Sequence, residues 1–173
     1  MTHDIAIDDF SVVDLLPTPG QAPQPGLAVL DLNKPTNANG DPIQFAFGGP
    51  YFSTVTAGDI LNFKMEGEPP QPIILFAGPL NPAAATYAGI GSIDVGGPVD
   101  PISGLPTLLS VIADGSAIGG FNPFFVTAAT GTTEIGFTVP NFPIGILGSF
   151  QLAILTSGGS GVSLSNCVQV DVQ

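Results

Sequence analysis

The sequence closes with GVSLSNCVQVDV, residues 161–172, and this stretch decides the fold class. Apolar residues take every second position in 162–164 and again in 168–172, with Ser, Gln and Asp between them. Successive side chains of a β-strand point to opposite faces, so the pattern places one face in a core and the other in water. We therefore predict a closing β-segment over Val162–Val172.

Short runs of the same kind occupy the rest of the chain. They are rich in β-branched and aromatic residues and are separated by Gly, Pro, Asn and Asp. No stretch keeps the i, i+3, i+4, i+7 apolar stripe of a helix. The other predicted strands are Leu27–Leu32, Ile43–Phe47, Ile60–Glu66, Ile73–Ala77, Ile90–Val95, Leu108–Ala113, Phe124–Ala128, Thr133–Val139 and Phe150–Thr156. Their number and spacing predict an all-β fold, either an antiparallel β-sandwich or a jelly roll.

The N-terminal residues stand apart from this pattern and divide into two segments. Residues 1–16 alternate like a strand, but the parity of the apolar positions changes at Asp8-Asp9, as at a bulge or a break between two strand pieces. Residues 17–26, PTPGQAPQPG, are typical of a polyproline-II connector. We predict a strand arm over 1–16, a Pro-rich connector over 17–26 and a β-sandwich domain over 27–173. The apolar positions of the arm are Ile5, Ile7, Phe10 and Val12.

Charge is scarce in this chain and almost wholly negative. The 173 residues include 14 Asp and Glu against two Lys and no Arg, for a formal net charge of -12. Nucleic-acid binding and attachment to an anionic membrane both need clustered cations, which the sequence lacks. It also lacks the run of about 20 apolar residues that a spanning helix needs. We therefore expect neither nucleic-acid binding nor membrane insertion.

The C-terminal half carries a looser signature. It consists of VPNFPIGILGSFQLA, residues 139–153, followed by SLSNCVQV, residues 163–170. This pair resembles the C-terminal β-rich module of secreted proteins from planctomycetes and myxobacteria-like bacteria, and residues 56–63, 93–97 and 130–135 follow its rhythm. The resemblance covers roughly residues 45–173. It implies an extracellular, non-catalytic module, and it carries over no binding residue.

Side chains suited to catalysis are few. His3 is the only histidine and sits at a terminus, where a solvated side chain is the ordinary expectation. Cys167 lacks the neighbouring cations that activate a thiolate, so we expect a buried structural thiol, with an intermolecular disulfide as the alternative. The loop-like GGSG at 158–161 lacks the spacing of a nucleophile elbow. Paired carboxylates could hydrolyse glycosides, but a chain without Trp or Arg furnishes a sugar cleft poorly. We expect no enzymatic activity.

Carboxylates are the one abundant functional group, and Ca²⁺ is the ion that suits them. Ca²⁺ takes about six to eight oxygen ligands from carboxylates and loop carbonyls. The sequence contains no EF-hand loop, so we expect no obligatory cofactor and keep Ca²⁺ as the alternative. The candidate metal ligands are Asp8, Asp9, Asp94 and Asp100.

These features favour a structural role. We expect a non-enzymatic extracellular or cell-surface protein, a mature form without signal peptide, that builds a filament or surface layer. Its arm would be donated to the sheet of a neighbouring copy, and head-to-tail donation gives a homopolymer. A phage or virion surface is a variant of this setting. The alternative function is a cell-surface or virion carbohydrate-binding module, with or without Ca²⁺, whose recognition loops carry Asp94, Asp100, Tyr51 or Tyr87.

Overall fold

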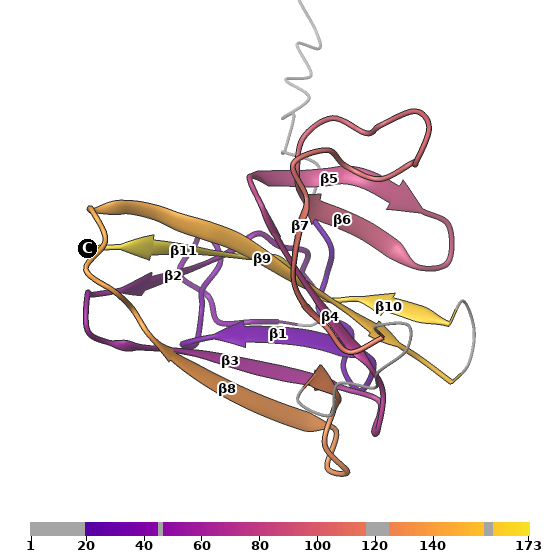
Figure 1. The fold of residues 1–173 in the computed structure, drawn as a ribbon, viewed down its shortest axis with the longest axis horizontal. Coiled ribbons are helices and arrows are strands. Elements are labelled where there is room, and N and C mark those ends of the chain that lie inside the picture. The colour runs from indigo at the N-terminus through magenta and orange to yellow at the C-terminus, as the bar shows by residue number, and fades with distance from the viewer. Residues whose placement is uncertain (1–19, 45–46, 117–124, 158–160) are drawn as a thin grey trace, which may run out of the picture.

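The chain folds into strands packed in layers. The computed structural model describes residues 20–44, 47–116, 125–157 and 161–173. These residues contain no α-helix, and hence none that could span a membrane. The strands are β1 (Ala28–Leu32), β2 (Tyr51–Val55), β3 (Ile60–Gly67), β4 (Ile73–Gly78), β5 (Leu80–Tyr87), β6 (Gly91–Val95), β7 (Ser110–Asp114), β8 (Thr132–Thr138), β9 (Gly145–Leu155), β10 (Val162–Leu164) and β11 (Val168–Val172). The all-β prediction is confirmed, with mostly antiparallel sheets packed as a β-sandwich (Figure 1).

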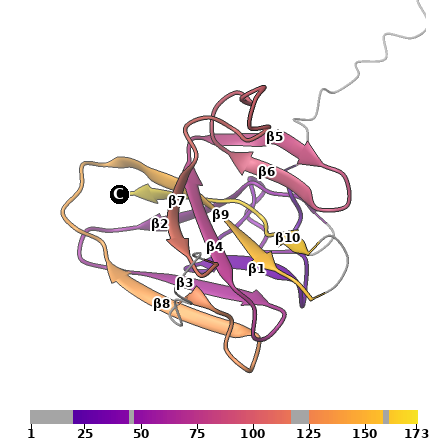
Figure 2. The ribbon, with the colours of Figure 1, turned by 45° about the vertical axis from the view of Figure 1, so that its right-hand side comes forward.

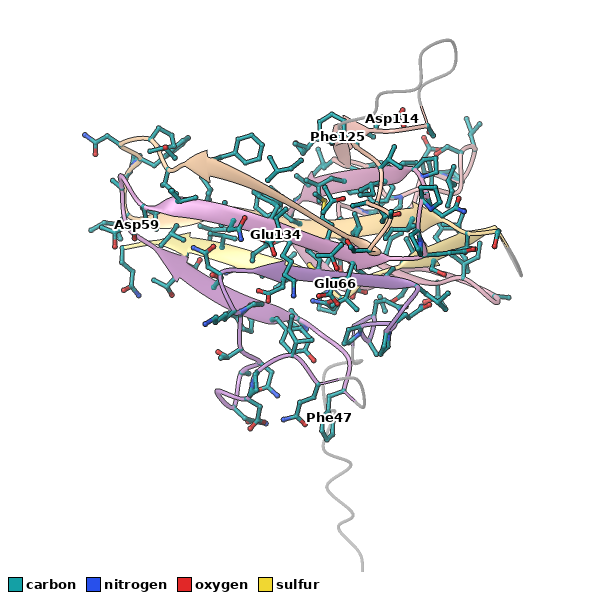
Figure 3. All side chains as sticks on the ribbon, turned by 90° about the horizontal axis from the view of Figure 1, so that it is seen from below. Phe47, Asp59, Glu66, Asp114, Phe125 and Glu134 are labelled. Atoms are coloured by element: carbon teal, nitrogen blue, oxygen red, sulfur yellow. The ribbon has the colours of Figure 1, made fainter. Side chains whose placement is uncertain are left out.

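The smaller sheet of the sandwich has the order β1-β3-β8 and is antiparallel throughout. Alternate residues of β3 are buried, which follows from the two-residue period of a strand. Its other face is polar and carries Glu66 and Glu134, seen from that side in Figure 3. There Lys64 Nζ lies 2.6 Å from Glu66 Oε1. Glu66, followed by Asp31 and Glu134, raises the pKa of Lys64.

The larger sheet has the order β2-β11-β9-β4-β7, and β10 also pairs with β9. The eleven-residue β9 is its centre, because it pairs with β11, β4 and β10. One pair departs from the antiparallel prediction: β11 runs parallel to β2. A hairpin joins only antiparallel strands, so a parallel pair has no turn sequence that would reveal it. Most of the chain lies between β2 and β11, and the sequence therefore could not indicate their relative direction.

A third, two-stranded sheet covers the larger one. Strands β5 and β6 pair with each other and lie on the side of β9 that faces away from the β1-β3-β8 sheet (Figures 1 and 2). The two interfaces bury separate apolar clusters. The cluster between the sandwich sheets includes Leu30, Phe63, Leu152 and Val170, and the cluster under β5 and β6 includes Ile93, Val95, Leu164 and Cys167.

In two of the predicted strands, Ile43–Phe47 and Phe124–Ala128, the described residues form no strand. The backbone of Gln44 and Phe47 bonds to a side chain instead. The Tyr51 hydroxyl accepts from Gln44 N (3.2 Å), and its single proton is shared between Gln44 O and Phe47 O, each 3.1 Å away. The predicted strand over Phe124–Ala128 contributes an isolated bridge, Val126 to Pro72. The Thr127 hydroxyl instead holds the loop around Gln71.

Other boundaries needed correction as well. The sequence missed β2 and β5, and the second of these is rich in Ala and contains Pro, both of which disfavour a strand. The predicted segment Val162–Val172 is two strands, β10 and β11, and β9 begins five residues before the predicted Phe150.

The described part of the predicted connector, residues 20–26, is fastened to the body. Gly20 N donates to Gly49 O at 2.9 Å, and Gly49 N donates to Gln21 O at 3.1 Å. Gln24 forms a bridge with Ala28, directly before β1. Residues 20–24 therefore do not act as a free spacer. The arm, residues 1–16, lies outside the described residues.

Candidate functional site

A large apolar groove lies between the two sheets of the sandwich. It encloses about 1110 Å³, against about 300–1,000 Å³ for common small-molecule pockets. Its walls come from β3 and β8 of one sheet and from β4, β7 and β9 of the other. The lining residues are Leu61, Phe63, Met65, Leu75, Ala77, Gly78, Pro79, Leu80, Ser110, Ile112, Ala113, Phe125, Ile135, Phe137, Ile146, Leu147, Gly148, Ser149, Phe150 and Gln169. None of them is charged, so the groove offers apolar contact and no acid–base chemistry.

The groove is bordered by two strands, β7 and β8, whose outer edges pair with no other strand of the described residues. Within the described ranges, β8 pairs with β3 alone and β7 pairs with β4 alone. Apolar side chains remain exposed along this border, with exposed fractions of 56% at Ile112, 54% at Phe137 and 69% at Ile146. An unpaired edge flanked by exposed apolar side chains is a template for a further strand.

Three aromatic rings give the groove a rigid wall. Phe63 on β3 contacts Phe137 on β8 edge-to-face, with ring centroids 5.6 Å apart and planes at 87°. It contacts Phe150 on β9 in the same way, at 5.3 Å and 90°. Edge-to-face pairs are a favoured aromatic geometry. Phe63 therefore connects the two sheets, while Phe137 extends toward the open side.

A second site lies where the N-terminal segment meets the body. Asp94 on β6 is fully buried, and its carboxylate accepts three hydrogen bonds. The donors are Gln21 N to Oδ2 (2.5 Å), Ala83 N to Oδ1 (2.8 Å) and the Ser92 hydroxyl to Oδ1 (2.9 Å). The side chain of Gln21 also binds β6, because its Oε1 accepts from Ser92 N at 2.8 Å. We call residues 20–21, held in this way, the root of the arm.

Tight packing also fixes the root. A Cβ at Gly20 would lie 2.5 Å from Asp94 Oδ2, so only glycine fits beside the carboxylate. Ala83, whose N–H points to Asp94, has a positive φ of 55°, a conformation that non-glycine residues adopt rarely. Sequence position alone could not predict either contact, since Gln21 and Asp94 are 73 residues apart.

The Asp94 site continues into a buried amide network. Gln151 on β9 is fully buried, and its Oε1 accepts from Asp94 N at 2.7 Å. Its Nε2 donates to Ser92 O and to Ser165 O, each at 2.8 Å. The amide of Asn166 binds the backbone of β1 in a similar way. Its Oδ1 accepts from Leu30 N (3.1 Å) and its Nδ2 donates to Leu30 O (2.9 Å). Side chains thus join β6, β9, β1 and the β10–β11 loop.

The predicted recognition residues are not brought together. Asp94 and Tyr51 lie on strands and are fully buried, so the prediction that they sit on recognition loops is wrong. Asp100 accepts from the backbone of Ile102 (2.6 Å) and of Ser103 in an exposed turn. The Tyr87 hydroxyl donates to Gly104 O at 2.6 Å, and burial raises the pKa of Tyr87.

No metal centre is formed by the described part of the chain. There, no three His, Cys, Asp or Glu side chains gather as a cation would require. Both carboxylate oxygens of Asp94 already accept hydrogen bonds from N–H and O–H groups. Asp8 and Asp9 lie outside the described residues, as do the arm positions Ile5, Ile7, Phe10 and Val12 and the terminal His3.

Cys167 is buried, as the sequence predicted. Desolvation raises the pKa of its thiol well above the ordinary value, and the Asp94 charge acts in the same direction. A thiol held neutral in this way is a poor nucleophile. Comparison of the chain with protein-family models, curated proteins and solved structures finds no match, so the site is interpreted from its own geometry.

Replacing Asp94 with Asn tests the root contact. An asparagine amide offers one oxygen where the carboxylate offers two, so Gln21 N and Ala83 N cannot both keep an acceptor. We expect hydrogen exchange of at least one of these two amides to accelerate by about tenfold or more, as for loss of a net hydrogen bond of about 1.5 kcal/mol. The Leu30 amide, held by Asn166, is the internal control. Unchanged exchange at both Gln21 and Ala83 would contradict the assigned contacts.

The pH dependence of stability tests the burial of the same carboxyl. Desolvation raises the pKa of Asp94 above its ordinary value of 3.8, against the opposing effect of the three donors. The folded state therefore holds this proton to higher pH than the unfolded chain does. The stabilisation that the raised pKa of Asp94 contributes is therefore fully present below the pKa of the unfolded chain. It is lost as the pH rises through the pKa of Asp94 in the folded state.

Urea denaturation of the wild type and of Asp94→Asn, between about pH 3 and about pH 7, measures this contribution. The free energy of unfolding of the wild type, minus that of the variant, should decrease as the pH rises above the unfolded pKa. A difference that stays constant or increases would show that the donors outweigh burial.

Proposed function

We propose that this protein is a self-assembling structural subunit, joined to its neighbours by donation of the arm, residues 1–16. The observation that carries the proposal is the uncharged groove between β7 and β8, whose outer edges are unpaired within the part of the chain that the structure describes. A donated strand supplies main-chain hydrogen bonds to an edge and alternate apolar side chains to a groove. The arm sequence offers both, through its backbone and through Ile5, Ile7, Phe10 and Val12.

The fastened root supports the same function. The body holds Gly20 and Gln21 by backbone bonds to Gly49 and by the buried Asp94 carboxylate. A force applied along the arm therefore reaches the body directly at β6 and, through Gln151, at the central strand β9. A subunit of a filament or surface layer needs such a connection, whereas a loosely tethered ligand-binding module does not.

The charge distribution suits an exposed assembly. Negative side chains keep a chain of low charge soluble, and they discourage unspecific pairing of sheet edges. On the solvent face of the β1-β3-β8 sheet, Asp31, Glu66 and Glu134 surround Lys64. With two lysines and no arginine, the chain also offers few sites to trypsin-like proteases. These properties favour an extracellular, cell-surface or virion setting.

Carbohydrate recognition has less support from the geometry. Of the four residues assigned to it, Tyr51 and Asp94 are buried, and the groove is lined by apolar groups. Sugar sites present polar hydrogen-bonding groups beside aromatic rings. The groove has aromatic rings, but few polar side chains line it. No observation favours Ca²⁺ at the described carboxylates.

Deletion of residues 1–16 tests the proposal. The full chain should sediment as polymers, and the deletion variant should sediment as monomers at the same concentration. The variant keeps Gly20 and Gln21, so the root contacts remain. Circular dichroism with a β-sheet spectrum should show that the body is folded.

A full-length variant separates loss of the arm from loss of its apolar positions. In it, Ile5, Ile7, Phe10 and Val12 are all replaced by Ser, and assembly should be lost as in the deletion. The matched control Asp8→Asn, Asp9→Asn keeps the apolar positions and should assemble. Polymers of wild-type size formed by the deletion variant would refute arm donation.

A further inference from the structure

We propose that the acceptor is the β8 edge of the groove, and that the arm of a second copy adds beside β8 as a fourth strand of the β1-β3-β8 sheet. This inference rests on the proposed function and adds to it the place, the sheet and the source of the donated strand. It assigns an interaction surface to the groove, with Phe137 and Ile112 on its two borders.

The orientation of β8 explains why a strand added there would fill the groove. Residues Ile135 and Phe137 of β8 stand opposite Phe63 and Leu61 of β3, and all four line the groove. A strand placed about 4.8 Å further along the sheet repeats this alternation. Its inward side chains would enter the space that β8 and β7 leave open, and its outward side chains would meet water beside Glu134.

The length of the arm matches β8 better than it matches β7. The eight residues from Ile5 to Val12 span about 26 Å as a strand, and the seven residues of β8 span about 23 Å. The five residues of β7 span about 17 Å. A bulge at Asp8-Asp9, one of the two interpretations of the parity change, would bring both apolar pairs of the arm to one face, as insertion into the groove requires.

The position of the root favours donation to another copy. Gln21 is held against β6, and β6 lies on the outer side of the larger sheet (Figures 1 and 2). The groove lies on the inner side of that sheet, between it and β8. The root and the groove therefore lie on opposite faces of the larger sheet. Donation between non-equivalent surfaces continues from copy to copy. It gives an open polymer unless the rotation that relates successive copies closes a ring.

Cross-linking in full-length chains tests the acceptor. A donor variant carries a single new cysteine at Ile5, Ile7, Phe10 or Val12, and an acceptor variant carries Phe137→Cys; donor and acceptor are co-expressed. Phe137 is more than half exposed, so a cysteine at this position is accessible, although it loses the edge-to-face contact with Phe63. The native Cys167 is buried and stays unreactive. We expect, for at least one donor position, a disulfide to residue 137 that joins two chains.

Matched controls give the result its meaning. Ile102→Cys, on a residue that is 95% exposed and away from the groove lining, should form no such disulfide. In chains without new cysteines, Phe137→Asp and Ile112→Asp should each reduce polymer formation at least tenfold, because an acidic groove repels the acidic arm. Ile102→Asp should assemble as the wild type does.

The outcomes separate this inference from the function on which it rests. If deletion of residues 1–16 abolishes assembly but no donor cysteine reaches residue 137, the acceptor lies elsewhere and this inference is overturned. If one chain carrying both cysteines closes a disulfide within itself, and the co-expressed pair forms none, the arm occupies its own groove and donation between copies is refuted. If the deletion variant assembles, the proposed function fails first.

Discussion

One buried amide organises the molecule. Gln151 sits at the centre of the longest strand, accepts from Asp94 N and donates to the backbone oxygens of Ser92 and Ser165. A buried polar group is costly unless its partners are present, so this network allows one arrangement of β6 on β9. Because Asp94 in turn holds Gln21, the same network fixes the root, residues 20–21, against β6.

The sandwich is closed on one side and open on the other. Around β1, β9 and β11, Leu30, Leu152 and Val170 fill the space between the sheets. Toward β7 and β8, the groove is lined by small residues such as Ala77, Ala113 and Gly148. Beside them, Phe63 contacts Phe137 and Phe150 and so joins the two sheets at the groove wall. Among the described residues, nothing pairs with the outer edges of β7 and β8, and the sequence ahead of the root has the apolar alternation that a further strand would need.

Alternation in the sequence was sufficient to predict the all-β class and most strands, because burial of one face imposes a period of two. It failed where side chains replace strand pairing, as Tyr51 does for Gln44 and Phe47. It also failed for the candidate site. Asp94 looked like a surface ligand because its partners, Gln21, Ala83 and Ser92, converge only in the fold. The groove was equally hidden, since its residues read as ordinary core.

Negative-stain electron microscopy of the purified full chain tests the central claim, that the open side of each sandwich receives the arm of another copy. The account predicts extended polymers or sheets with a regular subunit repeat. Dispersed single particles of the size of one sandwich, at concentrations where the chain is stable, would contradict it.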